Sequence, residues 1–310
     1  MMYYPTLQTR FSYATLAQLK DVGWLNITDT ASDATLLSLL EESSKRCNRI
    51  CNRFFYLCND TRYFDGQASR IVLDDDLYAL TSMSVDPTGS GIYSLTYSAT
   101  NTPPDMFLYP LNRTPTTTIE VNWNGQYGTF YAGFRSNIKI QGVWGHGPDV
   151  YNNAFEDSGI AITTPMTAAQ TNAFTYKFPI TFWTPTAWYT LSLPAGSSGK
   201  LSAGMTIMLD TEMMYILQVY TAMDVALVLR ATMGTMLAGH TGSEIYVAQY
   251  PADINRACLI MAKDEYNKRL SSGGAVGNIV TGTGNAPVSN DAERLLKPYR
   301  REHTAVWVGD

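Results

Sequence analysis

The histidines are the side chains of this sequence best suited to proton transfer or metal binding near neutral pH, and none stands in a known catalytic motif. His146 and His240 lie in glycine-rich turns, and His303 lies in the C-terminal tail. The sequence has no HExxH zinc motif, no Gly-x-Ser-x-Gly nucleophile turn and no phosphate-cradling P-loop. We therefore expect no catalytic residues and do not predict an enzyme.

Cysteines and clustered carboxylates are the remaining groups that could hold a metal. Cys47 and Cys51 are one helical turn apart with no histidine nearby, and Cys58 and Cys258 complete the set. The burial habit of free cysteine favours reduced, buried thiols over a zinc site. The run 74–76 is three aspartates, but it lacks the alternating oxygen ligands and terminal Glu of an EF-hand loop. We predict polar caps on a strand edge there, and no metal or other cofactor.

A short segment near the C-terminus has the composition of an assembly arm. It follows a Gly/Ser-rich linker at 271–290, whose r.m.s. reach is roughly 25 Å. It combines leucines, a proline stop, a tyrosine and several cations, which suit contact with another protein. The alternative is an arm folded back on its own subunit. The arm residues are Arg294, Leu295, Leu296, Lys297, Pro298, Tyr299, Arg300 and Arg301.

A second basic group is predicted on a long helix spanning about 31 to 55. Lys45, Arg49 and Arg53 recur every four residues, opposite a core face that includes Leu36 and Leu40. Such a stripe is either a solvated helix face or a contact with DNA or with acidic groups of a partner.

The residue pattern changes twice along the chain, from helical to strand-like and back to helical, which predicts an α+β fold. We expect a discontinuous α-helical bundle built from N- and C-terminal segments, a large β-rich insertion and an extended C-terminal arm. The helical core comprises 1–60 and 250–272, and a β-rich hairpin and sheet region comprises 61–150. An additional β module spans 151–249, and the linker and arm span 273–310.

Charge and hydropathy exclude several classes of protein. The chain has 22 Lys+Arg against 27 Asp+Glu, and this acidic balance disfavours general nucleic-acid affinity, which needs several cations on one face. The first residues lack the basic and apolar regions of a signal peptide. The most apolar run, 213–229, is broken by Gln218, Thr221 and Asp224, so no membrane span is expected.

Several motifs, taken in their order, resemble the phage head-to-tail connector, or adaptor, family. They cover about residues 12–150 and 250–301, while the block at about 151–249 is absent from a minimal adaptor. The Glu212, Arg230-Ala-Thr-Met-Gly-Thr235 and His240 pattern of that block is similar to a small β module of other phage structural proteins. The adaptor-like motifs are Tyr13-Ala-Thr-Leu-Ala-Gln-Leu-Lys20, Asp33 with Leu36-Leu37 and Leu39-Leu40, Asn52-Arg-Phe-Phe55, Arg70-Ile-Val-Leu-Asp-Asp-Asp-Leu-Tyr-Ala-Leu-Thr-Ser-Met-Ser-Val-Asp86, Ile138-Lys-Ile-Gln-Gly-Val-Trp-Gly145, Pro251-Ala-Asp-Ile-Asn-Arg-Ala257 and Leu295-Leu-Lys-Pro-Tyr-Arg300.

The resemblance implies a structural role in the virion. Adaptors of this family form rings, usually of twelve copies, beneath the portal protein, with C-terminal arms docked on the portal and a central channel for DNA. It implies as partners the portal, the tail or neck proteins below the ring and further copies of the chain, with non-specific passage of viral DNA and no membrane. The arm would contact the portal, and Lys45, Arg49 and Arg53 would line the channel or a subunit interface. Assembly would take place in the host cytoplasm.

Two other classes of function remain open. Aromatic side chains in the β-rich loops could form a carbohydrate-binding or adhesion module, because aromatic rings stack on sugar faces. A cell-wall-cleaving enzyme is the other alternative, although no carboxylate pair is singled out among the fourteen acidic residues of 61–250. The loop residues considered for sugar binding are Trp123, Asn124, Tyr127, Tyr131, Trp183 and Trp188.

Overall fold

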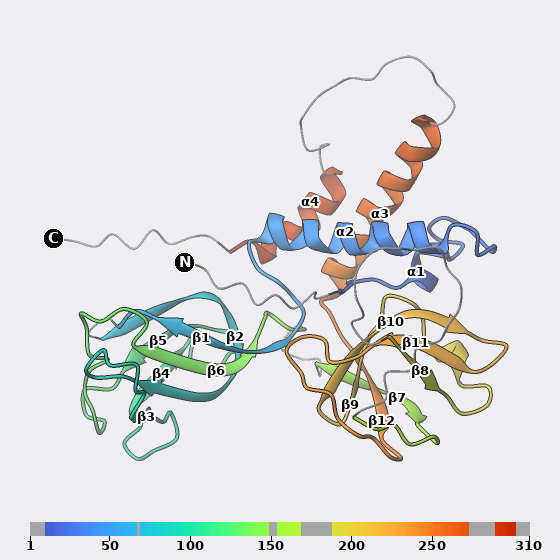
Figure 1. The fold of residues 1–310 in the computed structure, drawn as a ribbon. Helices are drawn as coiled ribbons and strands as arrows, with labels where there is room; N and C mark the ends of the chain where they lie inside the picture. The colour runs from blue at the N-terminus through green and yellow to red at the C-terminus, as the bar shows by residue number, and fades with distance from the viewer. Residues whose placement is uncertain (1–9, 67–68, 149–153, 169–187, 273–288, 302–310) are drawn as a thin grey trace. The chain divides into compact units, whose positions relative to one another are not determined.

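The computed structural model has an α+β fold with two compact units, and it describes residues 10–66, 69–148, 154–168, 188–272 and 289–301 (Figure 1). The first unit combines residues 1–52 with 153–310, and the second is residues 53–152. Both units contain a six-stranded antiparallel sheet. The described helices belong to the first unit.

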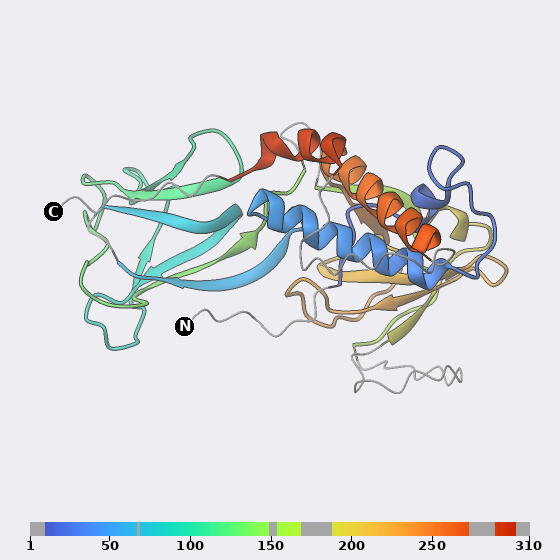
Figure 2. The same ribbon diagram turned by 90° about the horizontal axis from the view of Figure 1, so that it is seen from above.

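The helical layer of the first unit contains segments from both ends of the chain. It includes α1 (Leu16–Lys20), α2 (Asp33–Cys51), α3 (Ala252–Ser272) and α4 (Asn290–Leu296), followed by the 3-10 turn η2 (Lys297–Tyr299). In both views α3 lies beside α2, and α4 lies beside α3 (Figures 1 and 2). Ser44 Oγ on α2 is 3.2 Å from Cys258 Sγ on α3, which marks how closely these helices pack.

Local sequence explains where α1 begins and where α2 ends. Thr15 caps α1 through a reciprocal capping box with Gln18. At the C-terminal end of α2, Asn52 adopts a left-handed conformation with φ 51°, which stops the helix. The predicted end near residue 55 is therefore wrong, and Arg53 lies beyond the helix.

The sheet of the first unit lies under these helices. Its order is β7-β12-β9-β10-β11-β8. Its apolar core includes Ile207, Met214 and Val228. The backbone N–H of Leu16 donates to the carbonyl of Ala203 at 2.9 Å, which ties α1 to the sheet. The strands are β7 (Phe155–Ala161), β8 (Trp188–Ser192), β9 (Thr206–Leu209), β10 (Glu212–Tyr220), β11 (Val225–Leu229) and β12 (Glu244–Ala248), and a 3-10 turn η1 (Ser198–Lys200) follows β8.

The second unit is built around one long strand, β2. It pairs with β5 at 70–72 and, after a register shift, again at Leu77, and from Leu77 to Val85 it pairs with β6 on its other edge. The sheet order is β1-β6-β2-β5-β4, with β3 also on β2. Trp144 and Ile119 lie in its core. The strands are β1 (Cys58–Phe64), β2 (Arg70–Val85), β3 (Leu95–Tyr97), β4 (Met106–Tyr109), β5 (Thr116–Val121) and β6 (Ile138–Trp144).

The aspartates at 74–76 fall within the register shift of β2 against β5. Asp75 forms an ion pair with Arg62 at 2.5 Å, and the buried Asp76 lies 3.5 Å from Arg53. No group of three or more metal-ligating side chains occurs among the described residues. The described helices also include none with both the length and the apolar character of a membrane span.

Candidate functional site

A buried ionic network in the first unit contains three of the residues singled out in the sequence. Glu212 and Arg230 have fully buried side chains and form a two-pronged pair, with Arg230 Nε and Nη2 donating at 2.9 and 2.6 Å. His240 Nε2 lies 2.9 Å from the same carboxylate. The backbone N–H groups of Ala231 and Ala238 also donate to it, at 3.0 and 2.9 Å. Five donors thus converge on one carboxylate.

The network continues to the surface through Asp210, in the turn between β9 and β10. His240 Nδ1 lies 2.7 Å from Asp210 Oδ2, which also accepts a hydrogen bond from Ser243 Oγ at 2.7 Å. Both ring nitrogens of His240 therefore face carboxylate oxygens, one of Asp210 and one of Glu212. The hydrogen bonds from Ser243 and then His240 lower the pKa of Asp210.

Glu212 is held in its charged form despite its burial. Removal from water would by itself raise the pKa of Glu212. The hydrogen bonds from Arg230, from the Ala238 N–H and from His240 outweigh that effect, and the pKa is lowered. An ionised carboxylate is therefore a fixed part of this core.

The network restrains the loop between β11 and β12. Ala231 and Met233 adopt positive φ values of 52° and 54°, which non-glycine residues rarely do. The His240 backbone exchanges two hydrogen bonds of 2.8 Å with Met166. The nearby hydroxyl of Ser243 donates to Asp210 and not to the His240 ring, so the arrangement lacks the nucleophile–base contact of hydrolases. We call this network the clamp, because it ties the loop that contains Arg230, Ala238 and His240 to Asp210 and Glu212.

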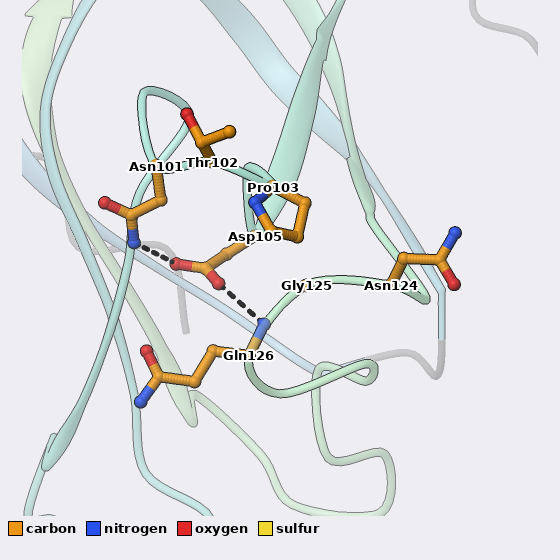
Figure 3. Close-up of a pocket in the computed structure, with 7 residues that line it drawn as sticks. All are labelled: Asn101, Thr102, Pro103, Asp105, Asn124, Gly125 and Gln126. Atoms are coloured by element: carbon orange, nitrogen blue, oxygen red, sulfur yellow. Dashed lines mark hydrogen bonds between the residues drawn. The ribbon is translucent and has the colours of Figure 1, made fainter.

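The second unit contains a polar depression (Figure 3). It is formed by two turns, residues 101–105 before β4 and residues 124–126 after β5, and it is an open hollow of about 440 Å³. Asp105 is 1% exposed and braces both turns, since its carboxylate accepts from Asn101 Nδ2 at 3.1 Å and from the Gln126 N–H at 2.9 Å. Sequence reasoning missed this site apart from Asn124, and the only signal was the Asn-Thr-Pro-Pro-Asp turn at 101–105.

The aromatic residues considered for sugar binding have different environments. Trp123 is 66% exposed on the turn that forms one wall of the depression. Tyr127 and Tyr131 are half-buried, and Tyr127 packs on Tyr97 with ring centroids 4.7 Å apart. Trp183 and the side chain of Trp188 lie outside the described residues.

The basic stripe is shorter than predicted. Lys45 and Arg49 are exposed on α2. Arg53 follows the helix, belongs to the second unit and forms an ion pair with Asp76. Arg53 is therefore not part of the exposed helical stripe.

The C-terminal arm residues differ most from their expected state. From Asn290 to Tyr299 the segment is helical, and Ala292 and Leu296 are buried. The Arg301 N–H donates to the Cys51 carbonyl at 2.8 Å. The expectation of an extended arm is wrong for this stretch, because its apolar side packs on its own chain. Leu295, Tyr299 and Arg301 are half-buried, whereas Arg294, Lys297, Pro298 and Arg300 are exposed.

The other singled-out groups have structural environments or lie outside the description. His146 is half-buried, with its ring 5.4 Å from that of Phe55. His303 and the linker at 273–288 lie outside the described residues. The four cysteines form no disulfide, and they are buried except for the half-buried Cys58.

No protein-family model, curated protein or solved structure matches this chain.

Proposed function

We propose that this protein is a structural adaptor of the neck of a tailed phage. Copies of the chain form a ring, of twelve in the family it resembles, beneath the portal protein. The ring joins the DNA-filled head to the tail and leaves a channel for DNA. The protein acts in the virion as a structural component without a cofactor, and not as an enzyme. Support comes from the order of the adaptor-like motifs along the chain and from one feature of the helical layer.

That feature is a set of exposed cations on a helix anchored to its own subunit. The exposed cations are Arg294 on α4, Lys297 on η2 and Arg300 directly after η2. The opposite side of the same segment is fixed by the fully buried Ala292 and Leu296. Because the segment is already ordered, a partner would not have to meet the entropy cost of folding it.

In this proposal the helices from the two chain ends form one discontinuous bundle, interrupted by the β-rich residues. The portal-docking arm extends over 273–310, and its attachment point is the ordered α4–η2 segment rather than a free tether. Arginine suits such a contact, because its planar group pairs with two carboxylate oxygens at once. Lys45 and Arg49 would line the channel or a subunit boundary, where a positive charge favours the passing phosphates.

The experiment is a charge reversal on the α4–η2 segment. The triple variant Arg294→Glu, Lys297→Glu and Arg300→Glu changes solvent-facing groups, so the fold should survive. Two exposed ion pairs are lost in this variant, Arg300 with Glu293 at 2.7 Å and Arg294 with Asp291 at 3.9 Å. We expect the variant to remain folded and to lose binding to the portal protein encoded with it.

A matched control reverses three exposed arginines of the second unit, Arg70, Arg113 and Arg135, to Glu. The control changes net charge by the same amount, so it should leave portal binding within about threefold if the α4–η2 cations are specific. An equal loss of portal binding in both variants would show that binding depends on net charge and not on the α4–η2 cations. Full binding by the α4–η2 variant would refute its role in docking.

A further inference from the structure

The loop between β11 and β12 carries two adjacent apolar side chains that face water. We call Met236 and Leu237 the tip, and their exposed fractions are 84% and 42%. Among the large apolar residues of the described part of the chain, Met236 is the most exposed. Single exposed apolar residues are common on protein surfaces, so the tip is informative only because of how its backbone is held.

That backbone is fixed on both sides of the tip. Before it, the Met213 N–H donates to Thr235 Oγ1 at 3.0 Å. After it, Ala238 belongs to the clamp, because its N–H donates to Glu212 at 2.9 Å and its carbonyl accepts from Arg230 Nη2. The buried ion pair therefore holds the tip in place before any partner arrives, which lowers the entropy cost of binding.

The charges near the tip disfavour lipid and nucleic acid as its partner. Residues 231–239 contain no ionisable side chain. Next to this loop are the exposed carboxylates of Asp210 and Glu244, brought together by the hydrogen bond from Ser243 to Asp210. Phosphates and anionic lipids are attracted by cations and repelled by carboxylates. The tip therefore fits an apolar, uncharged surface of a protein.

The first unit has a second surface of this kind in the loop after α1. We call residues 22–28 the receiving loop, and they also contain no ionisable side chain. Val22 is 78% exposed, and Trp24 and Leu25 are half-buried. This loop is ordered too, since the Trp24 N–H donates to the Asp21 carbonyl at 2.9 Å.

The two surfaces are placed for head-to-tail contact between copies. In both views the loop after α1 and the loop between β11 and β12 lie on opposite sides of the first unit (Figures 1 and 2). Two different patches on one chain form a heterologous contact, which closes into a ring when the rotation between copies allows it. Because both patches are uncharged, their contact buries no unpaired charge.

We propose that the tip of one copy docks on the receiving loop of the next copy. This inference rests on the proposed ring and names one of its subunit interfaces. Two exposed side chains cover far less than the roughly 800 Å² per partner of a standard protein interface. A single pair of copies should therefore associate weakly, whereas a closed ring, in which every copy makes the contact on both sides, should be stable.

The first test places the photo-crosslinker benzoylphenylalanine at position 236 of the full chain and irradiates the assembled ring with its portal. We expect crosslinks between two copies, and peptide mapping should place their second end in the receiving loop. Crosslinks that join position 236 only to the portal, to lipid or to other parts of the chain would overturn the proposal.

The second test uses one variant for each side of the contact, Met236→Glu and Val22→Glu. Both side chains are mostly exposed, so both variants should keep the parent melting temperature. Each alone should raise the concentration needed for ring formation by about tenfold or more, as loss of an interface anchor does. A tip-to-tip contact would instead leave Val22→Glu with full assembly.

An equimolar mixture of the two sides tests the direction of the contact. The Val22→Glu copy, with the crosslinker at position 236, keeps an intact tip, and the Met236→Glu copy keeps an intact receiving loop. Irradiation should therefore capture dimers and no larger species. The control Ile92→Glu changes a residue of the second unit that is 67% exposed, and it should assemble as the parent does.

The outcomes separate this inference from the adaptor proposal. Parent-like rings in both Met236→Glu and Val22→Glu would overturn the contact and leave the adaptor proposal standing. A parent chain that forms no ring with its portal would refute both.

Discussion

Neutralising Glu212 is predicted to cost more stability than any conservative change on the surface of the same sheet. The carboxylate has no exposed area and accepts from Arg230, His240, Ala231 N–H and Ala238 N–H. Glu212→Gln keeps the shape but replaces one accepting oxygen with a donating NH₂ that faces donors. It also leaves the Arg230 charge buried without its counter-ion.

The expected size follows from that uncompensated charge. Breaking a buried pair by removing one partner costs about 3–5 kcal/mol, against a total of about 5–15 kcal/mol for a whole domain. Urea unfolding followed by circular dichroism should show the transition of the first unit either at a much lower urea concentration or not at all. The matched control is Glu244→Gln on β12, which is exposed and should change stability by less than about 0.5 kcal/mol. A loss below about 1 kcal/mol for Glu212→Gln would refute the clamp.

Three further predictions concern protonation, thiol chemistry and the C-terminal helix. Folding lowers the pKa values of Asp210 and Glu212, so their contribution to stability is present above the unfolded pKa values of about 4 and is lost as the pH falls through the folded values. The urea concentration at the unfolding midpoint should therefore decrease when the pH is lowered below about 4, and equal midpoints at pH 3 and pH 6 would contradict this. Burial raises the pKa of Cys58 to about 12 and of Cys258 to about 11. Because the thiolate is the form that reacts, iodoacetamide at pH 7.5 should label these two thiols only in the unfolded chain, and equal labelling rates with and without urea would contradict this. Leu296→Ala should cost about 2–5 kcal/mol, because the side chain is fully buried, while the half-buried Leu295→Ala should cost less; an unchanged unfolding midpoint for Leu296→Ala would indicate a free arm instead.

Sequence reasoning found the α+β class because periodicity is a local property. The spacing of apolar residues predicted the core face of α2, and its residues Leu36, Leu40 and Cys47 are buried. The end of the helix was missed because it depends on one residue, Asn52, entering the left-handed region. The C-terminal helix was missed although it carries a start signal, Ser289 followed by Asp291 and Glu293, and a buried pair at i and i+4.

The sites themselves depend on contacts between strands, which a single sequence does not encode locally. Glu212 and Arg230 are 18 residues apart and meet because β10 pairs with β11. The two walls of the polar depression meet because Met106 pairs with Val121. The residue types at 212, 230 and 240 were visible in advance, but the register that brings them together was not.

The mass of the assembled particle tests the adaptor account most directly. The purified chain, with a subunit mass of 34.3 kDa, should be measured by native mass spectrometry alone and after mixing with the portal protein encoded with it. The account predicts a closed ring in complex with the portal, with one integral copy number and a mass equal to that multiple of the subunit plus the portal. A chain that stays monomeric at every concentration and adds no mass to the portal would contradict it.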